Sequence, residues 1–457
     1  MMQAPIVTPF ARAVVLAHTL LLAIASAQAP KPEQGAATGK AAQIDRYFDD
    51  RFDAEPDATD KLLALLFADR ARDPQELERM LRAPRHSYPA AAELIGKTTV
   101  HDVTCLHVDY ASKYRLYVPP SYTHDTPCPL VLVGHGGNSS MSPTRAARVA
   151  DHYLRAYAPS FAKHLGAIVI APHSSRGWGH IGNSLLLSCL ADAKRKLNVD
   201  PDRIFATGQS MGGHMAYRAA LLIPDRFGAV SPQSGGYDFA AKKSIGNLRN
   251  VPGYVTWGKQ EPYGIDVDNR RNQAWAEQNR LDWVFVEKNG GHKIYADELP
   301  KVARFFAAHP RNLYRDEVYL RAGGAMKFVN TWGVKGWPEH VVAHETRPLR
   351  WNLRHWLELT PRPDHKGPLT ARARYAGDNR FDIDCDQVRQ LVVHLHPKMV
   401  DFAKPVRVYA NGKEVFAEQV TPDPVHMLEL ARSYNDRGRI FWASVRVAVA
   451  DDRPVSM

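Results

Sequence analysis

Cysteine is scarce in this chain: among its 457 residues there are four, Cys105, Cys128, Cys189 and Cys385. So few cysteines exclude a dense disulfide framework, and their spacing matches no zinc-binding motif. One pair is a candidate for a bridge, Cys105–Cys128, because both residues flank neighbouring predicted strands. Four buried free thiols are the alternative.

The chain also lacks blocks of one charge and, beyond residues 1–29, any apolar run long enough to span a bilayer. The formal net charge is +11, yet the lysines and arginines are scattered. Neither a basic patch nor a nucleic-acid-binding motif is present. The charge therefore favours solubility or loose attraction to acidic surfaces, and no nucleic-acid partner is expected.

Residues 1–29 are typical of a secretory signal. Arg12 precedes an apolar run over residues 13–25, and two small-x-small cleavage sites end at Ala27 and Ala29. The run is short for a membrane span, so cleavage is favoured over an uncleaved anchor. We expect an exported protein, periplasmic or extracellular, with no integral membrane span after cleavage.

Hydrophobic periodicity divides the remaining chain into three parts. Residues 30–99 read as a linker and a helical lead-in packed on the main domain, without chemistry of its own. Between residues 100 and 310 strands and helices alternate, which predicts an α/β domain with a mainly parallel sheet. The expected strands are 107–110, 114–118, 129–134, 166–171, 203–207, 228–231, 252–257 and 281–286. The expected helices are 143–165, 182–197, 213–222, 269–279 and 296–308.

The most informative stretch lies between a predicted strand and a predicted helix. Gly208–Gly212 reads Gly-Gln-Ser-Met-Gly, a G-x-S-x-G motif. In a sharp strand-to-helix turn, glycines avoid steric collisions and the serine hydroxyl is lifted clear of the sheet. Ser210 is therefore the candidate nucleophile. The N–H of Met211, at the helix N-terminus, is a candidate oxyanion donor.

Partners for Ser210 follow other predicted strands, where ligands bind in parallel sheets. Gly136 and Gly137 follow strand 129–134 and can supply a second oxyanion N–H. His292 follows the last strand and is the candidate general base. Glu261 is the favoured acid to orient it. Asp266 and Asp268, a little further along the chain, are the alternatives.

These motifs resemble those of the α/β-hydrolase esterases. The groups with similar motifs are the polyhydroxyalkanoate depolymerases, feruloyl esterases and dienelactone hydrolases, together with prolyl-oligopeptidase catalytic domains. The resemblance covers residues 100–310 and implies Ser210 as nucleophile, His292 as base, and oxyanion N–H groups at Met211 and near Gly136 or Gly137. In one departure, relatives usually carry His-Gly-x-x-Asp where this chain reads Trp-Gly-Lys-Gln-Glu at 257–261.

Two residues near the motif are candidates for substrate binding. Gln209 lies inside the motif, and Trp178 follows strand 166–171, where it could stack on an aromatic or sugar ring or simply pack. The insertion between Gly236 and Pro252 is short. An open groove is therefore expected, which favours a bulky, polymeric or glycan-linked ester.

Residues 311–457 predict a small β-rich accessory module. Asn411–Gly412 between two apolar runs is a hairpin signal, and residues 424–434 read as a helix. The module contains Trp332, Trp337, Trp351 and Trp356. Tryptophans of this kind either bind glycan or, more often, belong to a core.

The sequence as a whole predicts a serine hydrolase that cleaves carboxylic esters through an acyl-serine intermediate. This chemistry needs no metal and no organic cofactor. A peptidase of the prolyl-oligopeptidase kind and a non-catalytic binding protein with the same fold are the alternatives.

Overall fold

The protein is described by a computed structural model that covers residues 34–50, 55–68, 70–88, 91–236, 239–322, 352–450 and 455. The predicted signal segment, residues 1–29, lies outside the described residues, as do Trp332, Trp337 and Trp351. None of the helices in the described part combines the length and the apolar character needed to cross a bilayer.

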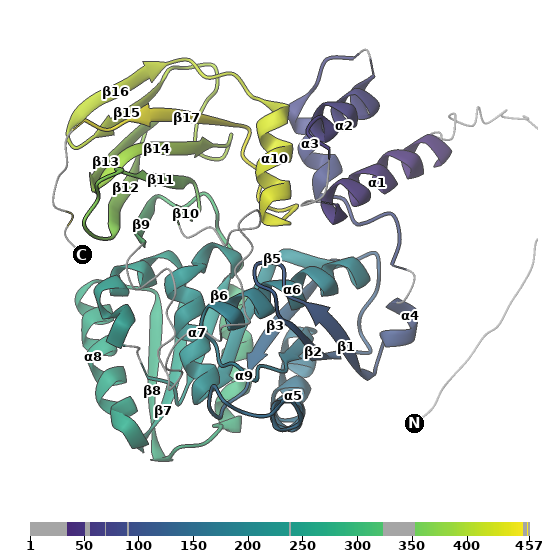
Figure 1. The fold of residues 1–457 in the computed structure, drawn as a ribbon, viewed down its shortest axis with the longest axis vertical. Helices are drawn as coiled ribbons and strands as arrows, with labels where there is room; N and C mark the ends of the chain where they lie inside the picture. Colours follow the sequence, from purple (N-terminus) through teal and green to yellow (C-terminus); the bar gives the residue numbers. More distant parts are fainter. Residues whose placement is uncertain are drawn as a thin grey trace, which may run out of the picture.

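The main domain is built on an eight-stranded sheet in the order β1-β2-β4-β3-β5-β6-β7-β8 (Figure 1). Strands β3 to β8 run parallel to one another, whereas β1 pairs with β2, and β2 with β4, in antiparallel orientation. The predicted mainly parallel sheet is thereby confirmed. The strands are β1 Thr98–Thr104, β2 Ala111–Tyr117, β3 Cys128–Gly134, β4 Ile168–Pro172, β5 Val199–Gln209, β6 Ala229–Gln233, β7 Gly253–Gln260 and β8 Trp283–Gly291.

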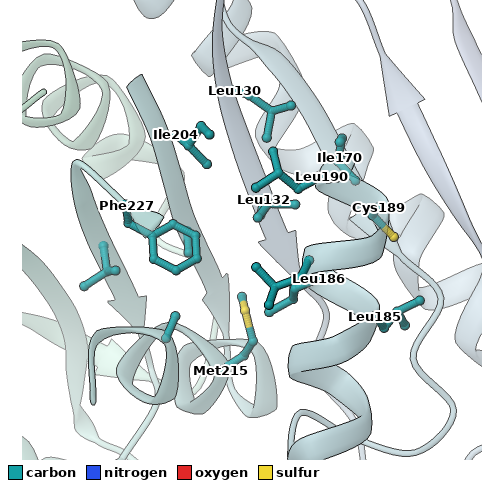
Figure 2. Packing of buried hydrophobic residues seen from close by; sticks show 14 of the residues in the cluster. Leu130, Leu132, Ile170, Leu185, Leu186, Cys189, Leu190, Ile204, Met215 and Phe227 are labelled. Carbon is teal, nitrogen blue, oxygen red and sulfur yellow. The ribbon is translucent and has the colours of Figure 1, made fainter. Parts of the chain in front are cut away.

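Helices cover both faces of this sheet, because strands such as β3 are buried throughout and need an apolar layer on each side. On one face α5 (Pro143–Leu165) packs with α9 (Leu299–Ala308), where Phe161 stacks on Phe306 at 5.7 Å. The other face carries α6 (His180–Lys196), α7 (Met211–Leu222) and α8 (Ile265–Gln278). Figure 2 shows Leu186 and Met215 of this layer pointing toward Leu132 of β3. Short helices complete the domain: η1 Pro224–Arg226, η2 Phe239–Asn250, η3 Pro262–Gly264 and η4 Ala296–Glu298.

The C-terminal part is β-rich, as predicted. Its sheets have the orders β10-β11-β14-β17 and β16-β15-β13-β12-β9, and they share one hydrophobic core. Asn411 and Gly412, with φ of 51° and 83°, form the predicted hairpin turn. Trp356 is fully buried and therefore belongs to this core. The elements are β9 Glu317–Ala322, β10 Leu353–Arg354, β11 Leu357–Pro361, β12 Leu369–Gly377, β13 Arg380–Asp386, β14 Val388–Leu395, β15 Val406–Ala410, β16 Lys413–Glu418, α10 Pro424–Tyr434 and β17 Ala443–Ala448.

The first three N-terminal helices pack on α10, whereas the fourth packs on the main domain, so the expected packing on the main domain holds for the last of them only. Buried side chains of the first three, among them Phe48 and Leu63, form one cluster with Met427 and Leu428 of α10 (Figure 1). The reason is that α10 presents a second apolar stripe, which the sequence alone does not match to its partner. The helices are α1 Gln34–Asp49, α2 Ala58–Phe67, α3 Pro74–Arg82 and α4 Ala91–Leu94.

One further expectation needs correction. Residues 107–110 do not form the first strand of the hairpin; β1 at Thr98–Thr104 pairs with β2 instead. This edge strand is mostly exposed or half-buried and has a polar sequence, so its periodicity is weak.

Of the two alternatives for the cysteines, free thiols are confirmed. All four cysteines, each in the described part of the chain, are buried and unpaired, so no bridge joins Cys105 and Cys128.

Buried ion pairs join the main domain to the C-terminal module. Arg311, in the segment between α9 and β9, contacts Asp436 after α10 and donates to Asp202 of β5 at 2.8 Å. The side chains of Arg311 and Asp436 are 1% and 2% exposed. Arg439 contacts Asp225 in the same junction, so charges from both parts of the chain neutralise one another away from water.

Replacing Arg311 by methionine is expected to lower the free energy of unfolding by about 3–5 kcal/mol, because Asp436 would stay buried without its counter-ion. Urea unfolding followed by circular dichroism measures the loss. Arg270→Met on α8 is the matched control, since Arg270 pairs with Asp266 and Glu287 at the surface and little change is expected. Equal losses in both variants would contradict the role given to this junction.

Candidate active site

Ser210 occupies the sharp turn between β5 and α7. Its backbone has φ 61° and ψ −121°, a conformation that residues other than glycine rarely adopt. The turn is forced by packing: a Cβ on Gly208 or on Gly212 would collide with the carbonyl oxygen of Gly134 at the end of β3. The glycines of the motif thus let β5 and α7 approach β3, and the serine between them takes the strained conformation.

Glu261 and His292 meet at the ends of the neighbouring strands β7 and β8. The Nδ1–H of His292 donates to Oε2 of Glu261 at 2.5 Å, and the N–H of Gly258 donates to Oε1 at 3.0 Å. The glutamate side chain is fully buried in this arrangement, whereas the imidazole is 28% exposed. With Nδ1 occupied as a donor, Nε2 of His292 is the nitrogen available to accept a proton.

The environment of Glu261 keeps this carboxylate ionised. Burial by itself raises the pKa of Glu261, but hydrogen bonds from His292, Ser234 and Gly258 outweigh it and hold the pKa below its ordinary value. Asp266 is instead paired with Arg270 at 2.8 Å on the surface of α8. Of the candidate acids, Glu261 is therefore the one whose contact with His292 the geometry supports.

The serine and the histidine lie at the same edge of the sheet. Strands β5, β6, β7 and β8 are consecutive parallel neighbours, so their carboxyl ends meet there. The N–H of Ser210 donates to the carbonyl of Gln233 at 3.0 Å, and the hydroxyl of the next residue, Ser234, donates to the carbonyl of Lys293 at 3.1 Å. Two adjacent residues at the end of β6 thus connect the turn of Ser210 to the loop of His292.

Ser234 is a site residue that the sequence analysis missed. It has φ 40°, and its hydroxyl lies within hydrogen-bond reach of both Glu261 and the carbonyl of Lys293, so its one proton can be donated to either acceptor. The signal that could have found it was its position directly after β6, in a Gln-Ser-Gly-Gly stretch at the same edge as the other candidates.

The loop after β3 runs beside Ser210. A Cβ on Gly136 would lie 3.2 Å from the Cβ of Ser210, and Gly137 has φ 119°. Met211, which follows Ser210, is the first residue of α7 and is buried. The backbone N–H groups predicted as oxyanion donors, from Met211 and from Gly136 or Gly137, therefore belong to segments that flank the serine.

His135 holds this loop in place. Its Nε2 accepts the N–H of Ser174 at 3.1 Å, and its Nδ1–H donates to the carbonyl of Gly136 at 2.9 Å. Burial lowers the pKa of His135 to about 4, so the ring is neutral and keeps one donor and one acceptor at physiological pH. This histidine braces the backbone rather than exchanging protons with substrate.

Trp178 and Gln209, predicted to bind substrate, are both buried. The indole N–H of Trp178 donates to the carbonyl of His135 at 3.0 Å, and only 3% of the residue is exposed. Oε1 of Gln209 accepts the hydroxyl of Tyr153 at 2.5 Å. These contacts favour a packing role for both residues under the loops of the site.

Within the described part of the chain, no group of three or more His, Cys, Asp or Glu side chains is arranged to hold a metal ion. The expectation that neither a metal nor an organic cofactor takes part stays a prediction.

Comparison with known proteins yields one family and several similar chains. Residues 108–298 match the model of the esterase family, described as "Putative esterase". The "Probable feruloyl esterase C" of Aspergillus oryzae is 29% identical over 128 residues, which cover 27% of this chain and 46% of that protein. The chain thus spans about half the length of this relative.

Two solved structures are similar to the main domain. A thermostable esterase has a TM-score of 0.40 and 19% identity, with 47% of this chain and 63% of that chain covered. A fluorophosphonate-binding serine hydrolase of Staphylococcus aureus has a TM-score of 0.37 and 18% identity, with 46% of this chain and 98% of that chain covered.

Replacing Glu261 by glutamine is expected to lower kcat by roughly 10³–10⁴-fold, because an amide cannot fix the Nδ1–H tautomer of His292 or stabilise the imidazolium. Ester turnover measured under saturating substrate gives the effect. Asp266→Asn, which removes a surface carboxylate of the next helix, serves as the control and is expected to retain activity. If Asp266→Asn were the inactive variant, the acid would have been assigned wrongly.

Proposed function

We propose that this chain, whose residues 108–298 match the model of the esterase family, is a serine hydrolase of the α/β-hydrolase fold that cleaves carboxylic esters through an acyl-enzyme. One observation carries the proposal. A buried glutamate bound to a partly exposed imidazole lies at the same sheet edge as a serine held with positive φ. If the pair of Glu261 and His292 only stabilised the fold, it would not require a serine in a strained backbone conformation at the same sheet edge.

The mechanism follows from the positions of these groups. Nε2 of His292 takes the proton of Ser210 as its oxygen attacks the ester carbonyl, and Glu261 stabilises the imidazolium that forms. Backbone N–H groups of Met211 and of Gly136 or Gly137 stabilise the negative oxygen of the tetrahedral intermediate. His292 then gives the proton to the departing alcohol, and a water molecule activated by the same ring hydrolyses the acyl-serine.

The substrate is proposed to be a bulky or polymeric ester, with a glycan-linked ester as the favoured case. The insertion after β6 forms η2, which packs at the end of α7 that is remote from Ser210, through a hydrogen bond from Asn247 to the carbonyl of Leu221 at 2.8 Å. Because η2 lies at the far end of α7, it does not cover Ser210, and we expect substrate to reach this serine between the short loops at the sheet edge. The similarity to a protein named as a feruloyl esterase supports an ester of an aromatic acid as the first substrate to test.

Export to the periplasm or the extracellular space is part of the proposal. It rests on the signal-like sequence of residues 1–29. Free thiols are compatible with an oxidising compartment when they are unreactive, and burial raises the pKa of Cys105 to about 12 and that of Cys128 to about 11.

Ser210→Ala is expected to lower kcat on esters by about 10⁴-fold or more and to abolish covalent labelling by a fluorophosphonate, because the nucleophile is removed while the Cβ and the turn are kept. The thermal midpoint should stay near that of the wild type. Ser444→Ala is the matched control: it removes a serine hydroxyl from β17 of the C-terminal module, leaves the site untouched and should still be labelled.

Ester and peptide panels run on the same preparation separate the proposed activity from that of a peptidase. Near-wild-type turnover by Ser210→Ala would refute the proposed nucleophile. Absence of labelling and turnover in the wild type would indicate a binding protein that has the fold without the chemistry.

A further inference from the structure

Tyr263 is the most exposed large apolar side chain in the described part of the chain, with 83% of its surface accessible. Its backbone is also left-handed, with φ 62° and ψ 18°. A tyrosine in this conformation is strained relative to glycine or asparagine, and an exposed ring gains no packing in return. Neither local backbone preference nor burial explains a tyrosine at this position.

Tyr263 follows closely after a residue of the candidate active site. It lies in η3, two residues after Glu261, whose carboxylate binds His292. The first turn of α8 follows directly, and a Cβ on Gly236 would lie 3.4 Å from the side chain of its Ile265. The carbonyl of Gly236 in turn accepts the Nδ1–H of His214, which is one helical turn after Ser210.

Val267 is a second exposed apolar side chain close in sequence to Glu261. It is 42% exposed, and it lies four residues after Tyr263 in the first turn of α8. The other exposed large apolar side chains of the described residues, Leu65, Val100 and Val284, lie in α2, β1 and β8. Tyr263 and Val267 are therefore the two that follow closely after the proposed acid.

We propose that Tyr263, together with Val267, is a specificity-determining platform for a flat ring carried by the ester. An aromatic ring and the apolar face of a sugar share the chemistry that this surface recognises, since both stack on a phenol ring. The proposal rests on the proposed function. The strained turn is what holds the ring outward beside the site rather than against the protein.

The test compares Tyr263→Asn and Tyr263→Phe with the wild type. Asparagine tolerates the left-handed conformation but has no ring, whereas phenylalanine keeps the ring. The esters are methyl cinnamate, an acetylated xylo-oligosaccharide and methyl butyrate. In Tyr263→Asn, the ratio of kcat/KM for a ring-bearing ester to that for methyl butyrate is expected to fall by about 3- to 10-fold, mainly through KM. Tyr263→Phe should keep the ratio.

Thermal stability supplies the second readout. Because Tyr263→Asn relieves backbone strain, its thermal midpoint is expected to match or exceed that of the wild type by up to about 3 °C. Val100→Ala, which shortens an exposed side chain on the edge strand β1, is the control and should change neither the ratio nor the activity.

The outcomes separate this inference from the proposed function. A fall in the cinnamate ratio identifies an aromatic ring as the ligand, and a fall in the xylo-oligosaccharide ratio identifies a sugar. Unchanged ratios in Tyr263→Asn, or a lowered midpoint with equal losses on all three esters, overturn the platform. Fluorophosphonate labelling of the wild type is run in parallel. If labelling succeeds and the ratios do not move, only the platform fails; if labelling fails, the hydrolase proposal fails.

Discussion

The close approach of α7 to the end of β3 is the constraint on which the candidate site depends. The carbonyl oxygen of Gly134 occupies the space that side chains at Gly208 and Gly212 would need. This contact bends the chain sharply at Ser210, so the strain in the serine is a consequence of packing. It also fixes where the chain continues after β3, which brings Gly136 against Ser210. The proposed nucleophile and the proposed oxyanion loop are thus positioned by a single backbone contact.

The other half of the site depends on the order of the strands. Because β6, β7 and β8 follow β5 in the sheet, each step across it adds one loop to the same edge. The loop after β6 supplies Ser234, which touches both Glu261 and the loop of His292. A carboxylate buried in this way needs several donors, and they come from the end of β7 and from the loops after β6 and β8. Glu261 and His292 are therefore held by neighbouring parts of the sheet rather than by one loop alone.

The parts of this structure that the sequence predicted correctly are those that short-range sequence signals determine. Helices α5 and α10 were predicted at their observed bounds, because each has a capping side chain, a proline in the first turn and a left-handed residue after its end. The order of Ser210, Glu261 and His292 was also readable, since each follows a strong strand signal. What failed depends on contacts distant in sequence: the pairing of polar strand β1 and the docking of α1, α2 and α3 on α10. For Trp178 the sequence left stacking and packing open, and its contact with His135 favours packing.

The C-terminal module is connected to the catalytic chemistry through the far end of α7. Asn247 of η2 donates to the carbonyl of Leu221, near the end of this helix, and to the carbonyl of Arg321 in β9 at 3.1 Å. Tyr319 of β9 packs on Gly246 of the same segment. Helix α7 is therefore held by Gly134 at its first turn and by η2 and β9 at its last. Because Met211 is the first residue of this helix, a tilt of α7 would move the N–H group that is proposed as an oxyanion donor. The contacts through η2 and β9 therefore restrain the proposed donor from the opposite end of the helix.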